Sequence, residues 1–175
     1  MPLIVPAPLS GHISIRFVTD YNSPLAFLIR ADTMAPVSHV EAVLRDGTVI
    51  GAYGGGVARR ANDADADSTN QMFVYIPRTN EQIDAWEAFL VSKIGTPYDY
   101  EAIAGFALHK DMHTPGHVIC SALITDALRH NGVVSDHLLK PDHMTSPSDL
   151  ATSLSFMAKM CDFVIVPLLL FEHRS

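Results

Sequence analysis

Alternating apolar and polar positions predict several short β-strands in the first half of the chain. HISIRFVT at residues 12–19 alternates as a half-buried strand does. VSHVEAVL at 37–44 and GTVIGAY at 47–53 predict two further strands, and the Asp46-Gly47 dipeptide between them is a strong hairpin signal. QMFVYIP at 71–77 predicts another strand. Residues 54–70 are rich in glycine, aspartate and small residues, so we expect a loop there.

Helical signals dominate the second half. Thr79 and Gln82 have the spacing of a capping box, and Gly95 is a typical C-terminal stop for the helix that follows. The expected helices cover 23–31, 79–95, 98–110, 119–131 and 146–156. The helix over 119–131 is amphipathic, and its apolar stripe consists of Cys120, Leu123, Ile124, Ala127 and Leu128.

The order of these elements favours an α+β fold. Strands come first, then helices, and the apolar segment DFVIVPLLLF at 162–171 closes the chain as an expected late core or edge strand. This order differs from the alternating βαβ pattern of a parallel sheet. A chain of 175 residues without an internal repeat or a long linker suggests one domain over residues 1–175.

Composition and charge narrow the class of protein. The chain is 48% hydrophobic and 18% charged, which is typical of a globular protein. Its net charge of -7 argues against a nucleic-acid partner, which needs a basic surface. The N-terminal segment lacks a basic region followed by an apolar run, so no signal peptide is expected. The segment at 162–171 is too short for a transmembrane helix and contains Pro167.

Cys120 stands at the front of the amphipathic helix, where the small residues Ser121 and Ala122 follow it. The pKa of a free cysteine is near ~8.5, and a helix N-terminus and a neighbouring histidinium both lower it. Such a cysteine is a candidate nucleophile. The alternative is that Cys120 is a small buried residue on the inner face of the helix.

His39 and Glu41 lie two residues apart on a predicted strand. Residues at this spacing point to the same side of a sheet, so an imidazole and a carboxylate are expected side by side. A carboxylate orients a histidine ring and stabilises its charged form, as a general base for a thiol requires. The alternative is a surface strand whose polar residues face water.

Four segments occur together in a particular order, namely SHVEAVLRDGTVIGAYGGGV, IGTPYDY, VICSALITDAL and SPSDL. Over about residues 23–155 the chain thereby resembles the circularly permuted papain-fold cysteine hydrolases related to NlpC, the YiiX/YaeF-like group. The resemblance implies an antiparallel sheet packed against helices, with Cys120 as nucleophile at a helix N-terminus and His39 as base. Glu41 is the candidate third group, which varies in that family. The chain departs from the pattern at Gly51, where relatives commonly carry an acidic residue.

The chemistry implied by this resemblance is acyl transfer by a cysteine peptidase or amidase that needs no cofactor or metal. The thiolate attacks an amide or ester carbonyl, and the histidine protonates the leaving group. The backbone N–H of the cysteine helps to bind the oxyanion. Candidate substrate-binding residues are Tyr98, Tyr53, Ser121 and His117.

The expected substrates are small peptides, such as those of the peptidoglycan type, or lipid-like cell-envelope compounds. An acyltransferase or lipid thioesterase on the same scaffold is one alternative, and a non-catalytic binding or assembly module is another. Such a protein is expected in the cytoplasm, or associated with a phage particle or a cell envelope. The sequence indicates no particular oligomeric state.

A histidine-rich stretch offers a third hypothesis. His109, His113 and His117 recur every fourth residue, which is a metal-ligand spacing on a helix, and Asp111 lies among them. The Pro-Gly pair at 115–116 is expected to break a helix before the last histidine. A solvated loop is therefore the preferred interpretation, and a zinc site is the alternative.

Two further features of the sequence indicate no functional site. Asp63, Asp65 and Asp67 resemble the start of a calcium-binding loop, but serine and valine stand where that loop needs glycine and a bidentate glutamate. Cys161 is expected to be buried and inert. With two cysteines in all, the chain is not a disulfide scaffold, and a reduced compartment is favoured.

Overall fold

The computed structural model describes residues 7–19, 37–63, 70–135 and 141–169. Within these ranges the strands are β1 (His12–Thr19), β2 (His39–Val43), β3 (Thr48–Tyr53), β4 (Gly56–Ala61), β5 (Asn70–Pro77) and β6 (Val164–Leu169). The α-helices are α2 (Asn80–Ser92), α3 (Tyr100–Leu108), α4 (Cys120–His130) and α5 (Pro147–Ala158), and η1 (Asp142–Met144) is a short 3-10 helix. The helix expected over 23–31 lies outside the described residues, as do Asp65 and Asp67.

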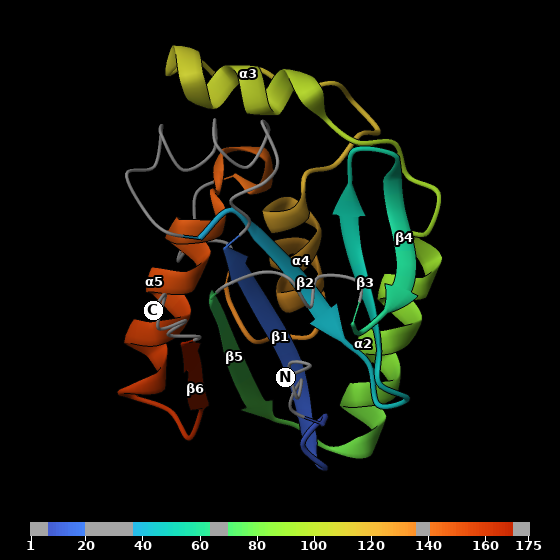
Figure 1. The fold of residues 1–175 in the computed structure, drawn as a ribbon, viewed down its shortest axis with the longest axis vertical. Coiled ribbons are helices and arrows are strands. Elements are labelled where there is room, and N and C mark those ends of the chain that lie inside the picture. Colours follow the sequence, from blue (N-terminus) through green and yellow to red (C-terminus); the bar gives the residue numbers. More distant parts are fainter. Residues whose placement is uncertain (1–6, 20–36, 64–69, 136–140, 170–175) are drawn as a thin grey trace, which may run out of the picture.

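The six strands form one antiparallel sheet with the order β4-β3-β2-β1-β5-β6 (Figure 1). The expected hairpin joins β2 to β3, and Gly47 in its turn has a φ of +81°, which favours glycine. β6 lies at an edge of the sheet, where a proline is tolerated. The α+β class that the order of elements predicts is therefore confirmed.

Residues 56–61 form the edge strand β4, so the loop expected over 54–70 is wrong for this part. β4 pairs with β3 on one side. On its other side, Val57 N–H donates to the Thr96 carbonyl at 2.8 Å, and Gly95 N–H donates to the Val57 carbonyl at 2.9 Å. A Cβ at Gly56 would lie 2.7 Å from the Thr96 oxygen. Local composition suggested a loop because it does not reveal these long-range partners. Val57 packs into the hydrophobic core.

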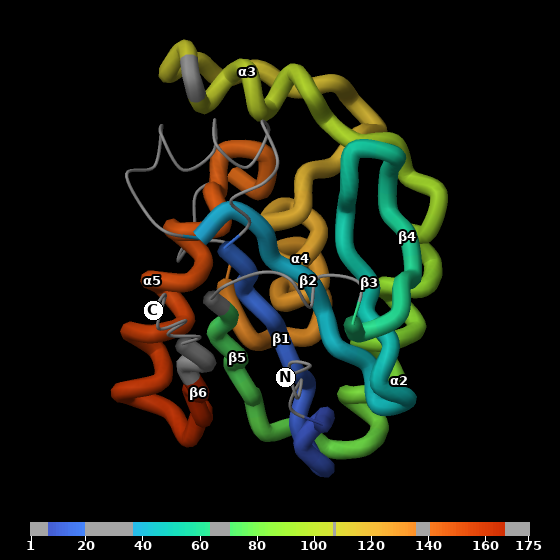
Figure 2. Tube along the Cα trace, in the orientation of Figure 1, coloured from blue at the N-terminus to red at the C-terminus, as the bar shows by residue number. Residues whose placement is uncertain are grey.

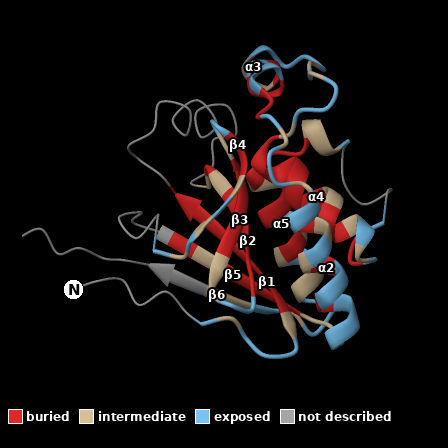
Figure 3. Cartoon of the chain, turned by 90° about the vertical axis from the view of Figure 1, so that its right-hand side faces the viewer, coloured by how far each residue is buried: buried red, intermediate tan, exposed pale blue. Residues whose placement is uncertain are grey.

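Helices α2, α4 and α5 pack against one face of the sheet, and α3 stands at one end (Figures 1 and 3). The strand residues on this face are apolar and buried, and they include Ile13, Ile15, Phe17, Val40, Ala42, Ile50, Val74 and Ile76. The predicted apolar stripe of α4 is confirmed, because all five of its residues are buried, Cys120 included. The helix-facing side of the sheet is thus the main hydrophobic core.

Three of the four described α-helices begin at a side-chain cap. Thr79 forms the expected capping box of α2, Asp99 caps α3, and Ser146 forms a capping box in α5. Helix α4 differs, because its N-cap residue is Ile119, whose side chain has no acceptor atom. The N–H groups of its first turn are therefore not satisfied by a side-chain cap.

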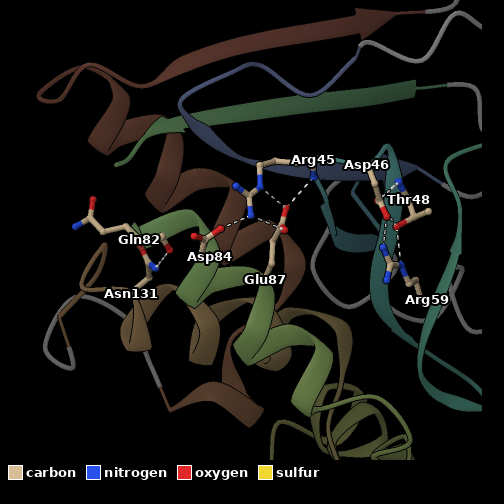
Figure 4. Close-up of polar contacts among 8 residues, drawn as sticks. All are labelled: Arg45, Asp46, Thr48, Arg59, Gln82, Asp84, Glu87 and Asn131. Carbon is tan, nitrogen blue, oxygen red and sulfur yellow. Dashed lines mark hydrogen bonds and ion pairs between the residues drawn. The ribbon is translucent and has the colours of Figure 1, made fainter. Parts of the chain in front are cut away.

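Polar contacts fix the β2–β3 turn against α2 and β4 (Figure 4). Arg45 N–H donates to Glu87 Oε1 at 2.8 Å, and the arginine side chain pairs with Asp84 and Glu87 on α2. On the other side of the turn, Asp46 pairs with Arg59 of β4. These pairs are largely exposed, so each contributes little stability, but together they position the hairpin between its neighbours.

The described helices are short. The longest, α2, has 13 residues. Within the described ranges, no helix combines the length and the apolar character that crossing a membrane requires.

Candidate functional site

The first residue of α4 and the first residue of β2 meet at one end of the sheet. Cys120 opens α4 and His39 opens β2, and the two elements can be followed by colour in Figure 2. Their side chains interact through charge and a hydrogen bond. The fold thus brings together two residues that lie far apart in the sequence.

The surroundings of Cys120 stabilise its thiolate. Burial by itself raises the pKa of the thiol, but the charge and the hydrogen bond of His39 lower it. The backbone N–H groups of Val40 and Ser121 lower it further, and the net result is a pKa below the ordinary cysteine value. The first turn of α4 carries no acidic residue, so the positive end of the helix dipole acts on the sulfur without local neutralisation.

His39 is the positively charged partner. Its side chain is 18% exposed. Burial lowers the pKa of the imidazole, whereas the Cys120 thiolate and the Glu41 carboxylate raise it, and the result is a pKa of about 10. The pKa of the thiol moves down and that of the imidazole moves up, so each group favours the charged form of the other.

Glu41 is buried on the sheet face opposite the helices. Its Oε2 lies 3.7 Å from Nε2 of His39 and accepts a hydrogen bond from the Tyr53 hydroxyl at 2.5 Å. Its Oε1 accepts a hydrogen bond from Nε of Arg16 at 2.5 Å. Burial raises the pKa of Glu41, but His39, Arg16 and Tyr53 together lower it to about 2. The carboxylate is therefore ionised at neutral pH, as an orienting partner of a histidinium must be.

Arg16 and Gly51 support this carboxylate, although sequence patterns did not predict either role. Arg16 is opposite Glu41 in the β1–β2 register and is completely buried. Its Nη1 donates to the backbone and side-chain oxygens of Asn62 at 2.7 and 2.9 Å. A Cβ at Gly51 would lie 3.0 Å from Cβ of Glu41 and 3.1 Å from the Tyr53 hydroxyl, so the glycine leaves room for their hydrogen bond.

One signal for Arg16 was present in the sequence. It is the one arginine in a strand of alternating apolar and polar residues, and Glu41 is the one acid in the next strand. Opposite charges facing each other across neighbouring strands stabilise a sheet. Strand register decides whether they face each other, and the register came only from the structure.

The two candidate substrate-binding tyrosines have different environments. Tyr98 is 6% exposed, and burial and the nearby negative charge of Cys120 raise its pKa, so its hydroxyl stays protonated beside the thiolate. Tyr53 lies with its ring centroid 5.1 Å from that of His39 and donates its hydroxyl to Glu41. The structure therefore places Tyr98 where the charge of Cys120 acts on it, and Tyr53 within the polar network around Glu41.

Ser121 and His117 are the other two candidates. Ser121 is completely buried, so its contribution near the thiolate is its backbone N–H and not its hydroxyl. His117 is exposed, and its Nδ1 lies 3.4 Å from the Pro115 carbonyl oxygen. The ring of His117 is thus positioned by its own loop.

The three histidines at every fourth position do not share a helix. α3 ends at Leu108, and His109 has a left-handed backbone with a φ of 50°. Instead, the ring of His113 stacks on that of His143 with centroids 4.2 Å apart. Oδ1 of Asp111 lies 2.7 Å from Nε2 of His143 and 4.0 Å from Nδ1 of His113. Within the described ranges, these three residues are the group whose donor atoms lie close enough to share a metal ion.

Cys161 is exposed, so the prediction that it is buried is wrong. It follows the end of α5 and precedes β6, and neither element covers it. Chemical labelling of Cys120 must therefore be carried out with Cys161 replaced.

Comparison with known proteins does not supply a family for this chain. The sequence matches no protein-family model, and it matches no curated protein at a significant score. The chemistry of the site is therefore the basis for assigning a function.

Proposed function

We propose that the protein is a cysteine hydrolase of the peptidase or amidase type, with Cys120 as nucleophile and His39 as general acid and base. The observation that carries this proposal is the position of Cys120 at the start of α4 beside His39, where the pKa of the thiol is lowered and that of the imidazole is raised. A thiolate is the reactive form of cysteine. A cysteine that served only as core packing would be a neutral thiol without a charged partner.

The reaction follows from the positions of these groups. The thiolate of Cys120 attacks the carbonyl carbon of an amide or ester, and a carbon–sulfur bond forms. The imidazolium of His39 donates its proton to the departing amine or alcohol as the bond to it breaks. Water then attacks the acyl-enzyme, and neutral His39 takes a proton from that water. Release of the carboxylic acid restores the ion pair.

Two donors are suited to the oxyanion that forms during this attack. The backbone N–H of Cys120 belongs to the uncapped first turn of α4, where helix N–H groups favour a negative charge. The protonated hydroxyl of Tyr98 lies close enough to Cys120 to feel its charge. We assign Tyr98 the role of the side-chain donor, which sequence patterns did not identify.

Glu41 acts through His39. It keeps the imidazole charged and limits the orientations of the ring, as the third member of a catalytic triad does. Arg16 in turn binds Oε1 of Glu41, and Tyr53 donates to Oε2, the oxygen that lies 3.7 Å from His39. In this arrangement Glu41, Arg16 and Tyr53 are positioning residues, and none of them contacts the reacting atoms.

The architecture is compatible with the permuted papain-like fold that the sequence resembles, because a histidine-bearing strand precedes a cysteine-bearing helix in the chain. That resemblance favours small peptides of the peptidoglycan type as substrates. An acyltransferase or a thioesterase would use the same acyl-enzyme and differ in the acceptor or in the ester that is cleaved. A non-catalytic binding module would have no need of an ionised thiol.

The test is a pH titration of the Cys120 thiolate, followed by its ultraviolet absorbance in a Cys161→Ser background with Cys120→Ser as the blank. We expect an apparent pKa well below ~8.5, and a return toward that value in His39→Ala. An activated ester should then leave an acyl group on Cys120 that mass spectrometry detects. An ordinary thiol titration that is indifferent to His39, together with no acyl adduct, would overturn the proposal and favour the binding module.

A further inference from the structure

Asp111, His113 and His143 form a compact group away from the thiolate site. One ligand atom from each residue lies within 4.8 Å of the other two. The shortest separation is 2.7 Å, between Oδ1 of Asp111 and Nε2 of His143, and Nδ1 of His113 is 4.0 Å from the same oxygen. Two ligands of a tetrahedral zinc ion are roughly 3.3 Å apart, given bond lengths near 2.0–2.1 Å. Shifts of about one ångström would therefore bring all three atoms to ligand positions.

The donor set identifies the class of ion. Two imidazole nitrogens and one carboxylate oxygen suit a divalent first-row transition metal such as Zn²⁺, whereas Ca²⁺ and Mg²⁺ prefer sites made of oxygen ligands. Three protein ligands leave at least one coordination position for water. The three side chains are accessible to an incoming ion, because Asp111 is 63%, His113 46% and His143 26% exposed.

Backbone contacts hold the loop that carries two of the ligands. Its first part folds back on α3, where Lys110 N–H donates to the Gly105 carbonyl at 2.9 Å. A Cβ at Gly105 would lie 2.7 Å from the Lys110 oxygen and 3.2 Å from Cβ of Met112, so glycine is required for this close approach. Farther along, Thr114 N–H donates to Oδ2 of Asp99 at 3.1 Å. Residues 111–113 are therefore fixed from both sides.

The third ligand comes from a separate element that is also anchored. His143 lies in η1, where the neighbouring Asp142 pairs with Arg129 near the end of α4. Met144 N–H donates to the Pro141 carbonyl at 2.9 Å and closes the short helix. A site whose ligands sit on fixed supports needs little ordering when the ion binds.

We propose that Asp111, His113 and His143 bind one divalent transition-metal ion, which joins the α3–α4 loop to η1. The loop leads directly into Cys120, so the ion would tie the segment before the thiolate to an element packed on α4. This proposal stands on the geometry of the three ligands and does not depend on the proposed hydrolase activity. The equally spaced His109 and His117 are not part of this site.

The test uses the full chain with Cys120→Ser and Cys161→Ser, so that zinc cannot bind a thiol, after removal of metal with a chelator. Zn²⁺ is titrated by calorimetry and its effect on Tm is measured. We expect one ion per chain, and a rise in Tm of roughly 5–10 °C when free zinc is a hundredfold above its Kd. His113→Ala, His143→Ala and Asp111→Asn should each lose most of this rise.

The matched control is His117→Ala, which removes an exposed histidine from the same loop and should keep the full zinc-dependent rise in Tm. Circular dichroism and the metal-free Tm of each variant show whether it is folded. Absence of zinc binding to the folded parent protein would overturn the proposal. The metal would lie elsewhere on the surface if His117→Ala lost the zinc-dependent rise in Tm to the same extent. Retention of the ion after replacement of all three ligands would have the same meaning.

Discussion

Two imidazole–carboxylate pairs in this protein differ in what surrounds them. In the pair His39–Glu41 the nitrogen and oxygen are 3.7 Å apart, with the carboxylate fully buried, whereas in the pair His143–Asp111 they are 2.7 Å apart and the carboxylate is 63% exposed. In the buried pair, Cys120 and Glu41 raise the pKa of His39 to about 10, although burial by itself lowers it. The two pairs therefore differ in their burial and in the third group that stands beside the histidine.

The group that stands beside each histidine determines what the imidazole–carboxylate pair can do chemically. Beside His39 stands a thiol, and the result is an ion pair suited to nucleophilic attack. Beside His143 stands a second imidazole, and the result is a ligand set suited to a metal ion. Water screens charges at the exposed pair, while the buried pair depends on Arg16 and Tyr53 for compensation. Substitutions in both pairs test whether burial distinguishes them.

The largest effect is expected from removing the reactive pair itself. Cys120→Ser and His39→Ala should each lower turnover of an activated ester by at least about 1,000-fold, because the nucleophile and its proton donor act as a unit. The double variant should be little worse than either single one. Steady-state kinetics on folded proteins provide the measurement. Full activity in His39→Ala would remove the histidine from the mechanism.

Glu41→Gln should cause the largest loss of stability. The change breaks the buried ion pair between Glu41 and Arg16, and breaking such a pair costs about 3–5 kcal/mol of unfolding free energy. The pKa of Glu41 is lowered to about 2 from 4.5, so its stabilisation is present above pH 4.5 and is lost as the pH falls toward 2. Urea denaturation should accordingly show that the unfolding free energies of the wild type and of Glu41→Gln converge at low pH. A constant difference down to pH 2 would contradict this assignment.

The rate of acylation should show a broad plateau as a function of pH. The rate should rise through the lowered pKa of Cys120, because the thiolate is the nucleophile. It should fall again near pH 10, where His39 loses the proton that the leaving group needs. In Glu41→Gln the upper limb should move to lower pH, since one of the groups that raise the His39 pKa is gone. An unmoved upper limb would show that Glu41 does not act on the histidine.

Tyr53→Phe should have a moderate effect. It removes one hydrogen bond to the buried carboxylate, at a cost of about 1.5 kcal/mol, while Arg16 still neutralises Glu41. The expected signature is a fall in kcat with a smaller change in KM, and a small downward shift of the upper pH limb. If Tyr53 instead contacts substrate directly, KM should rise while the pH profile stays unchanged.

The smallest effect is expected from Asp111→Asn in metal-free protein. This is the same carboxylate-to-amide change as Glu41→Gln, made in the exposed pair, and it should alter the unfolding free energy by no more than about 1 kcal/mol. Thermal denaturation in the presence of a chelator measures it. A loss of unfolding free energy as large as that expected for Glu41→Gln would show that exposure does not distinguish the two pairs.

Secondary structure could be predicted from the sequence wherever the signal is local. Periodicity located β1, β2, β3 and β5, the Thr79–Gln82 capping box located the start of α2, and Asp46-Gly47 located a hairpin. The spacing of His39 and Glu41 also placed both side chains on the same side of a strand, because the side-chain period of a strand is two residues.

Contacts between residues that are distant in the sequence could be identified only from the tertiary structure. β4 became a strand because it pairs with β3 and with residues 95–96, and Arg16 reached Glu41 through the register of β1 on β2. The ring of His113 stacks on that of His143 and not on that of His117. The reason is that the loop after α3 folds back on Gly105, and η1 packs beside α3. Periodicity describes neighbours along one element, whereas charge pairing and ligand geometry depend on elements that packing brings together from different parts of the chain.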